Sequence, residues 1–499
     1  MAVPVAQPVA PSGRLARNIA ALAGGQVVTW ALTLLWTLFV PRALGPAAMG
    51  QLTIATAATG VLSSVISLGI ATLMIKEIAR DHSRAPSLVG SAILLRVLCI
   101  LPAALIVAVY LRLLHADREL TMVMVLATAS MFLALFAGPI TAAMQGMEQM
   151  ELPTYTNVIN RAATAVGGVA LVMIGFHLVS LMVLGVVAAA VVLVLNAIWA
   201  RPYYRIAWSV DWRDMWRLAV DSLPYFMNVL ILTTYMWLDS VMLSFMTSST
   251  VVGWYGVPTK VFSTLLFLPT MLGTAWFPRM AAAAARGERD LARISRPALE
   301  IVLVVSLPIA VGTTLVAARL THGLFGPAYN ASAPVLVILA LALPATYVNI
   351  VGYQILVADN LQKAWLKVMI AATIINPLLN LGMIAYASAR WHNGAIGAAL
   401  SLLATEVLMA GAAFWLLPRI LDRSSASRLA RTVLATAVMA LFVLLATRLG
   451  LVAQVATGAV VFVGLGWLLR LLTPAETAEV RALAGRVLAR LPGRGGRPA

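Results

Sequence analysis

The chain has 499 residues, of which 62% are hydrophobic and 11% are charged, and its mean hydropathy is +0.94. A soluble domain is about half apolar and about one quarter charged, so this composition excludes a soluble protein and indicates one embedded in a bilayer. The net charge of +17 does not indicate a nucleic-acid partner, because Lys and Arg lie between apolar runs, where they contact anionic lipid headgroups. The single cysteine, Cys99, excludes an intrachain disulfide.

Apolar stretches of spanning length recur along the whole chain. A membrane helix needs about 20 such residues, whereas membrane strands are about 10 residues long and alternate in polarity. We therefore predict an all-α integral membrane protein with about fourteen transmembrane helices. The predicted spans are residues 19–40, 52–75, 88–111, 120–143, 157–176, 178–200, 218–246, 256–280, 298–320, 334–357, 367–386, 394–417, 432–450 and 452–471.

The distribution of basic residues predicts the orientation. If fourteen spans alternate, 25 Lys and Arg residues lie on the side of the two termini and 6 on the opposite side. Loops with excess positive charge stay in the cytoplasm. The protein is therefore predicted to be a multi-pass protein of the cell (inner, cytoplasmic) membrane with both termini in the cytoplasm.

A short internal similarity suggests two repeats. The segment LGPAAMGQLTIA (44–55) joins spans one and two, and MTSSTVVGWYGVP (246–258) joins spans seven and eight, with Gly50 in register with Gly253. Chance similarity between two glycine-containing turns is the alternative. Transporters are commonly built from such repeats and bind substrate where the repeats meet. The predicted parts are an N-terminal tail (1–18), an N-lobe (19–200), a linker (201–217), a C-lobe (218–417), an appended span pair (418–471) and a basic cytoplasmic tail (472–499).

Span seven carries a polar stripe. Asp221, Asn228, Tyr235 and Asp239 fall within about 40° of one another on one helix face, over a length of about 27 Å. Ionisable groups inside a membrane usually face a cavity or a partner. The stripe predicts the wall of a water-filled path, and a polar seam between packed helices is the alternative. Lys260 in span eight has the same inferred depth as Asp239, which predicts a charge pair with either a structural or a coupling role.

Other spans carry further candidate site residues. Arg96 lies about nine residues into span three, which is too deep for its side chain to reach either interface easily. Acidic residues could carry a proton or Na⁺. The candidate substrate or cavity residues are Gln26, Thr29, Thr33, Arg96, Asn157, Arg161, Tyr225, Asn228, Tyr235, Lys260, Asn376 and Asn380, and the coupling candidates are Asp221, Asp239, Lys260 and Glu406.

No enzyme signature is found in the sequence. It contains no HExxH, GxSxG or P-loop motif, and its five histidines are scattered over predicted loops, so no metal site and no cofactor are predicted. We predict that the protein is not an enzyme. Without a nucleotide-binding motif, any transport would need a lipid gradient, an ion gradient or the membrane potential.

Several segments together resemble the polysaccharide-transporter (Wzx-type oligosaccharide flippase) branch of the multidrug/oligosaccharidyl-lipid/polysaccharide (MOP) exporter superfamily. They are RNIAALAGGQVVTWALTLLWTLFVPRALGPAAMGQL (17–52), MQGMEQMELPTYTNVINRA (144–162), LDSVMLSFMTSSTVVGWYGVPTKVFSTLLFLPTMLGTAWFPRMA (238–281) and LFGPAYNASAP (324–334). The resemblance implies two pseudo-symmetric six-helix bundles around a central cavity, plus a C-terminal helix pair.

The resemblance also implies a function. The expected substrate is an isoprenoid (undecaprenyl-type) pyrophosphate oligosaccharide, moved by alternating access for surface polysaccharide biosynthesis. A pyrophosphate requires cations, and a glycan requires hydrogen-bonding and aromatic groups. We therefore expect Arg96 and Lys260 to bind phosphate or to take part in coupling, and we expect sugar to be bound by Asn228, Tyr225, Tyr235 and Gln26. The expected partners are this lipid-linked oligosaccharide, membrane lipids and polysaccharide-assembly machinery, with no nucleic acid. The alternatives are a lipid II flippase or a small-molecule (drug) exporter of the same superfamily, a membrane enzyme such as a glycan polymerase or ligase, and a non-transporting scaffold. The lipid II flippases carry arginines in their first two spans, and this chain has none there.

Overall fold

The computed structural model describes residues 13–208, 212–418 and 420–472, with side chains described from Val28 onward except at positions 30, 228, 288 and 289. The residues predicted to form most of the N-terminal tail and the basic C-terminal tail lie outside these ranges. Every regular element in the described ranges is a helix, because a chain in lipid must satisfy its backbone hydrogen bonds within each segment.

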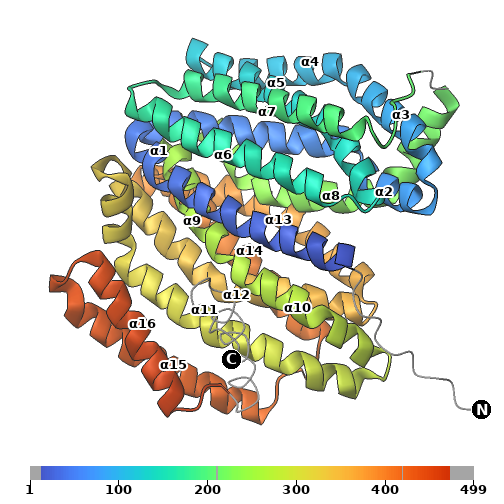
Figure 1. Ribbon diagram of the computed structural model, residues 1–499. Coiled ribbons are helices and arrows are strands. Elements are labelled where there is room, and N and C mark those ends of the chain that lie inside the picture. The colour runs from blue at the N-terminus through green and yellow to red at the C-terminus, as the bar shows by residue number, and fades with distance from the viewer. Residues whose placement is uncertain (1–12, 209–211, 419, 473–499) are drawn as a thin grey trace, which may run out of the picture. The chain divides into compact units, whose positions relative to one another are not determined.

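Sixteen α-helices and three short 3-10 helices make up the described part of the chain (Figure 1). They are α1 (Gly13–Ser67), α2 (Ile70–Arg80), η1 (His82–Arg84), α3 (Ala85–Leu98), α4 (Ile100–Leu113), α5 (Arg118–Gly146), α6 (Glu151–Met173), α7 (Leu178–Ala200), α8 (Trp212–Met246), α9 (Ser249–Leu265), α10 (Phe267–Ala284), α11 (Glu288–Phe325), η2 (Pro327–Ser332), α12 (Ala333–Ala358), α13 (Gln362–Trp391), α14 (Gly394–Leu416), α15 (Arg423–Leu445), η3 (Ala446–Arg448) and α16 (Leu451–Leu468).

Within the described residues, twelve helices are long and apolar enough to cross a membrane. The helix α1 counts once among them, although it breaks at Gly45, whose φ of 77° and ψ of 172° interrupt the helical backbone between predicted spans one and two. Helix α6 is not counted, because Asn157, Asn160 and Arg161 make its first half polar. Each predicted span thus falls on one helix or on two consecutive helices, while the count of fourteen membrane crossings stays a prediction.

The chain divides into two compact units. Unit 1 comprises residues 1–260, 321–332 and 369–401, and unit 2 comprises residues 261–320, 333–368 and 402–499. Helices α9, α11, α13 and α14 each contribute residues to both units. The two units are groups of residues that mainly contact one another, and they do not test the lobes. The lobes at 19–200 and 218–417 stay a prediction.

Unit 1 has a core in which α2 and α3 pack against α5, while α5 also lies along α7, and α6 lies along α1 (Figure 1). The buried side chains are almost all aliphatic, as expected for helices that meet other helices on one side and lipid on the other. The core members with no exposed surface are Ile70, Met74, Ile78, Ala85, Val89, Ala92, Ala143 and Met144.

The two glycines aligned in the predicted repeat contact each other within unit 1. A Cβ on Gly50 would lie 1.6 Å from the Ser249 carbonyl oxygen, and a Cβ on Gly253 would lie 1.9 Å from the Pro46 carbonyl oxygen. Ser249 lies 203 residues after Pro46, and Gly253 lies 203 residues after Gly50, so the two contacts are reciprocal. Two repeats related by a two-fold axis produce such a pair of contacts, because each contact in one repeat is repeated with the equivalent residues exchanged. Only glycine allows the two backbones to approach so closely.

Unit 2 holds the last two helices against α11. Val316 of α11 packs with Met439 and Val443 of α15, and α15 lies along α16 (Figure 1). A buried ion pair reinforces this packing: the Arg428 guanidinium of α15 is 2.7 Å from the Glu300 carboxylate of α11, and their side chains are 7% and 11% exposed.

Helix α15 begins with a capping box. The Asp422 carboxylate accepts hydrogen bonds from the backbone N–H groups of Ser424 and Ser425, and it pairs with Arg296 of α11. The hydrogen bond from the Ser424 hydroxyl, the backbone bonds and the Arg296 charge together lower the pKa of Asp422 to about 2. The cap satisfies backbone donors that have no partner inside the helix.

Candidate functional site

A buried carboxylate network forms in unit 1. The Asp239 side chain of α8 is 5% exposed, and its two oxygens accept from different partners: Tyr255 Oη of α9 at 2.8 Å and Asn380 Nδ2 of α13 at 2.7 Å. Asn380 also donates to Asn376 Oδ1 at 2.8 Å. Among the described residues, the Asp239 carboxylate bonds only to neutral donors. A buried charge without a counter-charge is unfavourable, so this network is suited to bind a proton or a small cation.

The predicted pair between Asp239 and Lys260 does not form in this structure. The Lys260 ammonium instead lies 3.7 Å from the centroid of the Trp36 ring of α1, a cation–π contact. The two residues have similar inferred depth, but depth leaves the direction of a side chain around its helix undetermined. Arg161 of α6 also belongs to unit 1, and its side chain is exposed. The structure thus places one cation, Lys260, against an aromatic face in unit 1.

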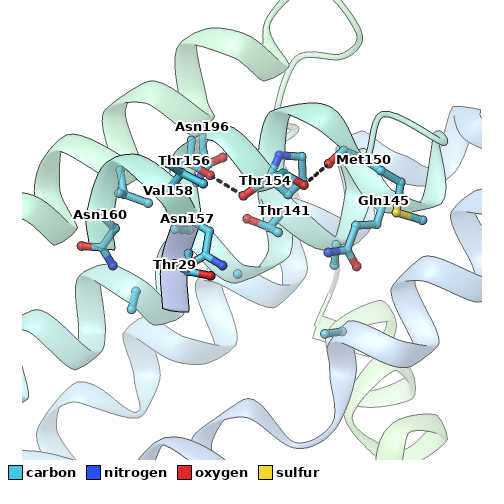
Figure 2. Close-up of a pocket in the computed structure, with 17 residues that line it drawn as sticks. Thr29, Thr141, Gln145, Met150, Thr154, Thr156, Asn157, Val158, Asn160 and Asn196 are labelled. Carbon is cyan, nitrogen blue, oxygen red and sulfur yellow. Dashed lines mark hydrogen bonds between the residues drawn. The ribbon is translucent and has the colours of Figure 1, made fainter. Parts of the chain in front are cut away.

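A cavity of about 440 Å³, lined by apolar and neutral polar residues, lies within unit 1 among α1, α2, α5, α6 and α7 (Figure 2). Of the sequence-predicted site residues, Thr29 and Asn157 line it, together with Asn160 of the same face of α6. The close-up shows amide and hydroxyl side chains from separate helices turned toward one space. Its lining residues are Thr29, Ala71, Ala134, Ala137, Gly138, Thr141, Ala142, Gln145, Met150, Pro153, Thr154, Thr156, Asn157, Val158, Asn160, Val192 and Asn196.

Arg96 of α3 lies deep in unit 1 beside this cavity. Its side chain is 2% exposed, and its Nε and Nη1 atoms have no hydrogen-bond partner in the described part of the chain. Its Nη2 atom is 4.0 Å from where a Cβ would stand on Gly138, a residue of the cavity wall. The predicted deep cation is therefore confirmed as buried, and its phosphate or coupling role stays a prediction.

The candidate residues on α8 do not come together in one site. Asp239 is buried, Tyr225 and Tyr235 are partly buried, and Asp221 is exposed. None of these four residues lines the cavity. On α1, Thr33 is exposed and donates to the Thr29 carbonyl oxygen. The side chains of Gln26 and Asn228 lie outside the described residues. The water-filled path predicted along this stripe stays a prediction.

Glu406 belongs to a separate network in unit 2. Its carboxylate accepts from Asn349 Nδ2 at 2.7 Å, and the same amide group donates to the Glu406 carbonyl oxygen at 3.0 Å. Both side chains are 5% exposed, so α12 and α14 are joined by a buried polar contact. The predicted coupling role of Glu406 is not tested by this arrangement.

Sequence reasoning missed several residues of these clusters. Tyr255, Trp36, Gln145 and Asn196 were not among the candidates, although each contacts or lines one of the sites described above. Tyr255 lies on α9, outside the polar stripe predicted in span seven, and Asn196 is a single amide in an apolar run. Asn157, at the start of α6, was the one predicted candidate of that helix that lines the cavity. Within the described ranges, no three His, Cys, Asp or Glu side chains gather as a metal site would require.

Comparison with solved structures identifies the fold. The structure aligns with the lipid II flippase MurJ in an inward closed conformation, with a TM-score of 0.70 and 13% identity, over 91% of this chain and 98% of MurJ. It also aligns with an inward-facing multidrug resistance MATE family transporter of the MOP superfamily, with a TM-score of 0.63 and 16% identity, over 83% of this chain and 98% of the transporter. The protein is thus a multi-pass membrane protein with the MOP superfamily fold.

Sequence comparison then gives the family. The chain belongs to the family described as polysaccharide biosynthesis protein, whose sequence pattern matches residues 15–284, and the MatE pattern matches residues 224–381. A curated relative is the "Probable flippase AglR" of Haloferax volcanii, which is 26% identical over 179 residues. That alignment covers 35% of this chain and 36% of the relative, so the chain matches about a third of the relative's length.

Proposed function

We propose that the protein flips isoprenoid (undecaprenyl-type) pyrophosphate-linked oligosaccharide across the cytoplasmic membrane by alternating access. The observation that carries this proposal is the Lys260 ammonium held against the Trp36 ring in unit 1. A cation suits the pyrophosphate, and an aromatic face suits an adjoining sugar ring. Membership of the polysaccharide biosynthesis family supports a glycan substrate, and the MurJ-like fold supports a lipid-linked one.

The Lys260 ammonium also disfavours export of cationic drugs. A site for a cation would place carboxylates, not Lys and Arg, around its ligand. Asp239 has its own partners in the Tyr255 and Asn380 network. In this proposal Asp239 is the coupling residue: uptake of a proton or Na⁺ compensates its buried charge, and this occupancy drives the conformational change.

The test is flipping by purified protein in proteoliposomes that contain lipid-linked oligosaccharide, measured by access of a glycan-modifying enzyme to the outer leaflet. Lys260→Met should reduce the flipping rate at least about tenfold, as expected when a charge-assisted contact of about 1.5–3 kcal/mol is lost, while Lys260→Arg should retain most activity. Lys363→Met, at the exposed start of α13, is the matched control. Flipping by Lys260→Met at the wild-type rate would refute the proposed site, and export of a cationic dye without flipping would favour a drug exporter. Competition by lipid II would identify the lipid II alternative.

The proposed location and orientation have their own test. In a Cys99→Ala background, a cysteine at position 424, in the first turn of α15, should be reached by a membrane-impermeant thiol reagent only after the cells are opened. Labelling of Ser424→Cys in intact cells would place this loop outside and refute cytoplasmic termini.

A further inference from the structure

The cavity in unit 1 is rich in amides. Gln145 of α5, Asn157 and Asn160 of α6 and Asn196 of α7 all line it (Figure 2). In the described part of the chain, none of these four amides makes a side-chain hydrogen bond to protein, and no charged or aromatic side chain is among the lining residues. Each amide offers both donors and an acceptor. The cavity therefore presents mixed, neutral hydrogen-bonding groups.

Asn196 shows that these groups need an occupant. The side chain is 1% exposed, and its Oδ1 atom is buried with no hydrogen-bond partner among the described residues. Leaving such a group unpaired in the interior is unfavourable. A purely structural position in an apolar stretch of α7 would be better filled by Leu or Val. An occupant of the cavity, which Asn196 lines, would offer its amide a partner.

The chemistry of the lining selects the class of occupant. The absence of charge in the lining suits a neutral ligand, and the alternation of donors and acceptors suits hydroxyl groups, which both donate and accept. The volume of about 440 Å³ falls within the range of small-molecule sites and exceeds that of a single buried water. A sugar ring with several hydroxyls meets all three conditions. Four amides from three helices would then form hydrogen bonds with its hydroxyls and distinguish sugars by the positions of these groups.

We infer that this cavity is a glycan subsite that holds a sugar unit of the substrate through Gln145, Asn157, Asn160 and Asn196. The inference rests on the proposed function, and it assigns substrate specificity to residues distinct from the cation at Lys260. A site that reads hydroxyls by hydrogen bonds discriminates strongly, because a sugar lacking the matched hydroxyl leaves buried amides unpaired.

The experiment measures sugar binding independently of transport. A reporter cysteine replaces Ala134 of α5, an exposed residue of the cavity lining, in a Cys99→Ala background of the full-length protein. The rate of its modification by a small neutral methanethiosulfonate is measured with and without glucose, galactose, mannose, N-acetylglucosamine or glucuronic acid. Glycine betaine controls for osmotic effects. A second reporter, Ser427→Cys on exposed α15, controls for effects on the reagent.

At least one sugar should slow modification at Ala134→Cys and leave the Ser427→Cys rate unchanged. Asn196→Leu should raise the half-protecting sugar concentration about fivefold or more, the effect of losing a typical hydrogen bond, and Gln362→Leu, outside the cavity, should not. Because Asn196→Leu removes an unpaired polar group, its folded yield should match the parent.

Protection by none of the sugars, or equal protection in Asn196→Leu, would show that the cavity holds only water and would overturn the inference. Flipping assays separate this result from the proposed function. Sugar protection that survives in Lys260→Met while flipping is lost supports both. Normal flipping with no sugar protection would overturn the subsite and leave the proposed function standing. Sugar protection in a wild-type protein that flips no lipid-linked glycan would overturn the proposed function and leave the sugar-binding cavity standing.

Discussion

The reciprocal contact between Gly50 and Gly253 gives a sharp prediction about packing. An added methyl at Gly253 would lie 1.9 Å from the Pro46 carbonyl oxygen, whereas close C–H···O contacts in proteins have C···O distances of about 3.3 Å. The backbones of α1 and α9 must therefore separate by about 1.4 Å. The opposing atom is backbone, so no side-chain rotation relieves the clash. Overpacking of this kind costs about 1–3 kcal/mol and occasionally more.

A partial gain opposes this cost, since Ala is about 1 kcal/mol better than Gly within a helix. We expect Gly253→Ala to lower the free energy of unfolding by up to about 2 kcal/mol, with a larger loss for Gly253→Val. Gly50→Ala should behave similarly, because its Cβ would lie 1.6 Å from the Ser249 carbonyl oxygen. Once either substitution has separated the helices, the second costs less, so the double variant should lose less than the sum.

The assay is thermal unfolding of the detergent-solubilised protein, read by loss of monodisperse protein after heating. Gly185→Ala is the matched control, because this helical glycine of α7 has no atom within 4 Å of an added Cβ. The control should be neutral or stabilising. A Gly253→Ala variant as stable as the Gly185→Ala control would refute the reasoning, as would strict additivity of the two glycine substitutions.

Three further predictions concern charged side chains. Arg96→Met should raise the free energy of unfolding by about 1–3 kcal/mol, since it removes a buried, unpartnered guanidinium, and a lower melting temperature would show that Arg96 has a stabilising partner. Arg428→Met should cost about 3–5 kcal/mol by stranding the Glu300 carboxylate, and the double variant with Glu300→Leu should recover most of that loss in the same melting assay. Because the pKa of Asp422 is lowered to about 2 from 3.8, its stabilising effect should be present above pH 3.8 and lost as pH falls through about 2. The melting-temperature gap between wild type and Asp422→Asn should shrink over that interval, and a constant gap would contradict the assignment.

Much of the site could not have been found without the three-dimensional structure. Periodicity identified Asp239 as a polar position on α8, and the Asn residues of α13 and the start of α6 as candidates. Depth then suggested Lys260 as the partner of Asp239, whereas the partners are Tyr255 and Asn380. Asn380 follows Asp239 by 141 residues, so no local pattern links them.

The sequence by itself determined the class, the helices and the family. A long apolar run in lipid can satisfy its backbone groups only as a helix, so span positions follow from composition: residues 178–200 were predicted and α7 runs from Leu178 to Ala200. The sequence underestimated helices that continue past the apolar run, as at α11, which begins at Glu288, ten residues before the predicted span. Those extra turns are amphipathic, and hydropathy alone cannot detect them.

Only the tertiary structure decided which polar side chains meet. Membrane helices pack through many similar small and aliphatic residues, so the rotation of each helix about its axis is set by the sum of weak contacts with all its neighbours. That rotation directs Lys260 to Trp36 rather than to Asp239, and it turns Asn160 and Asn196 into one cavity. Rotating a helix by a fraction of a turn is enough to change the partner of a polar side chain. Hydropathy and residue spacing along the chain are the same before and after such a rotation, so they do not predict the partner.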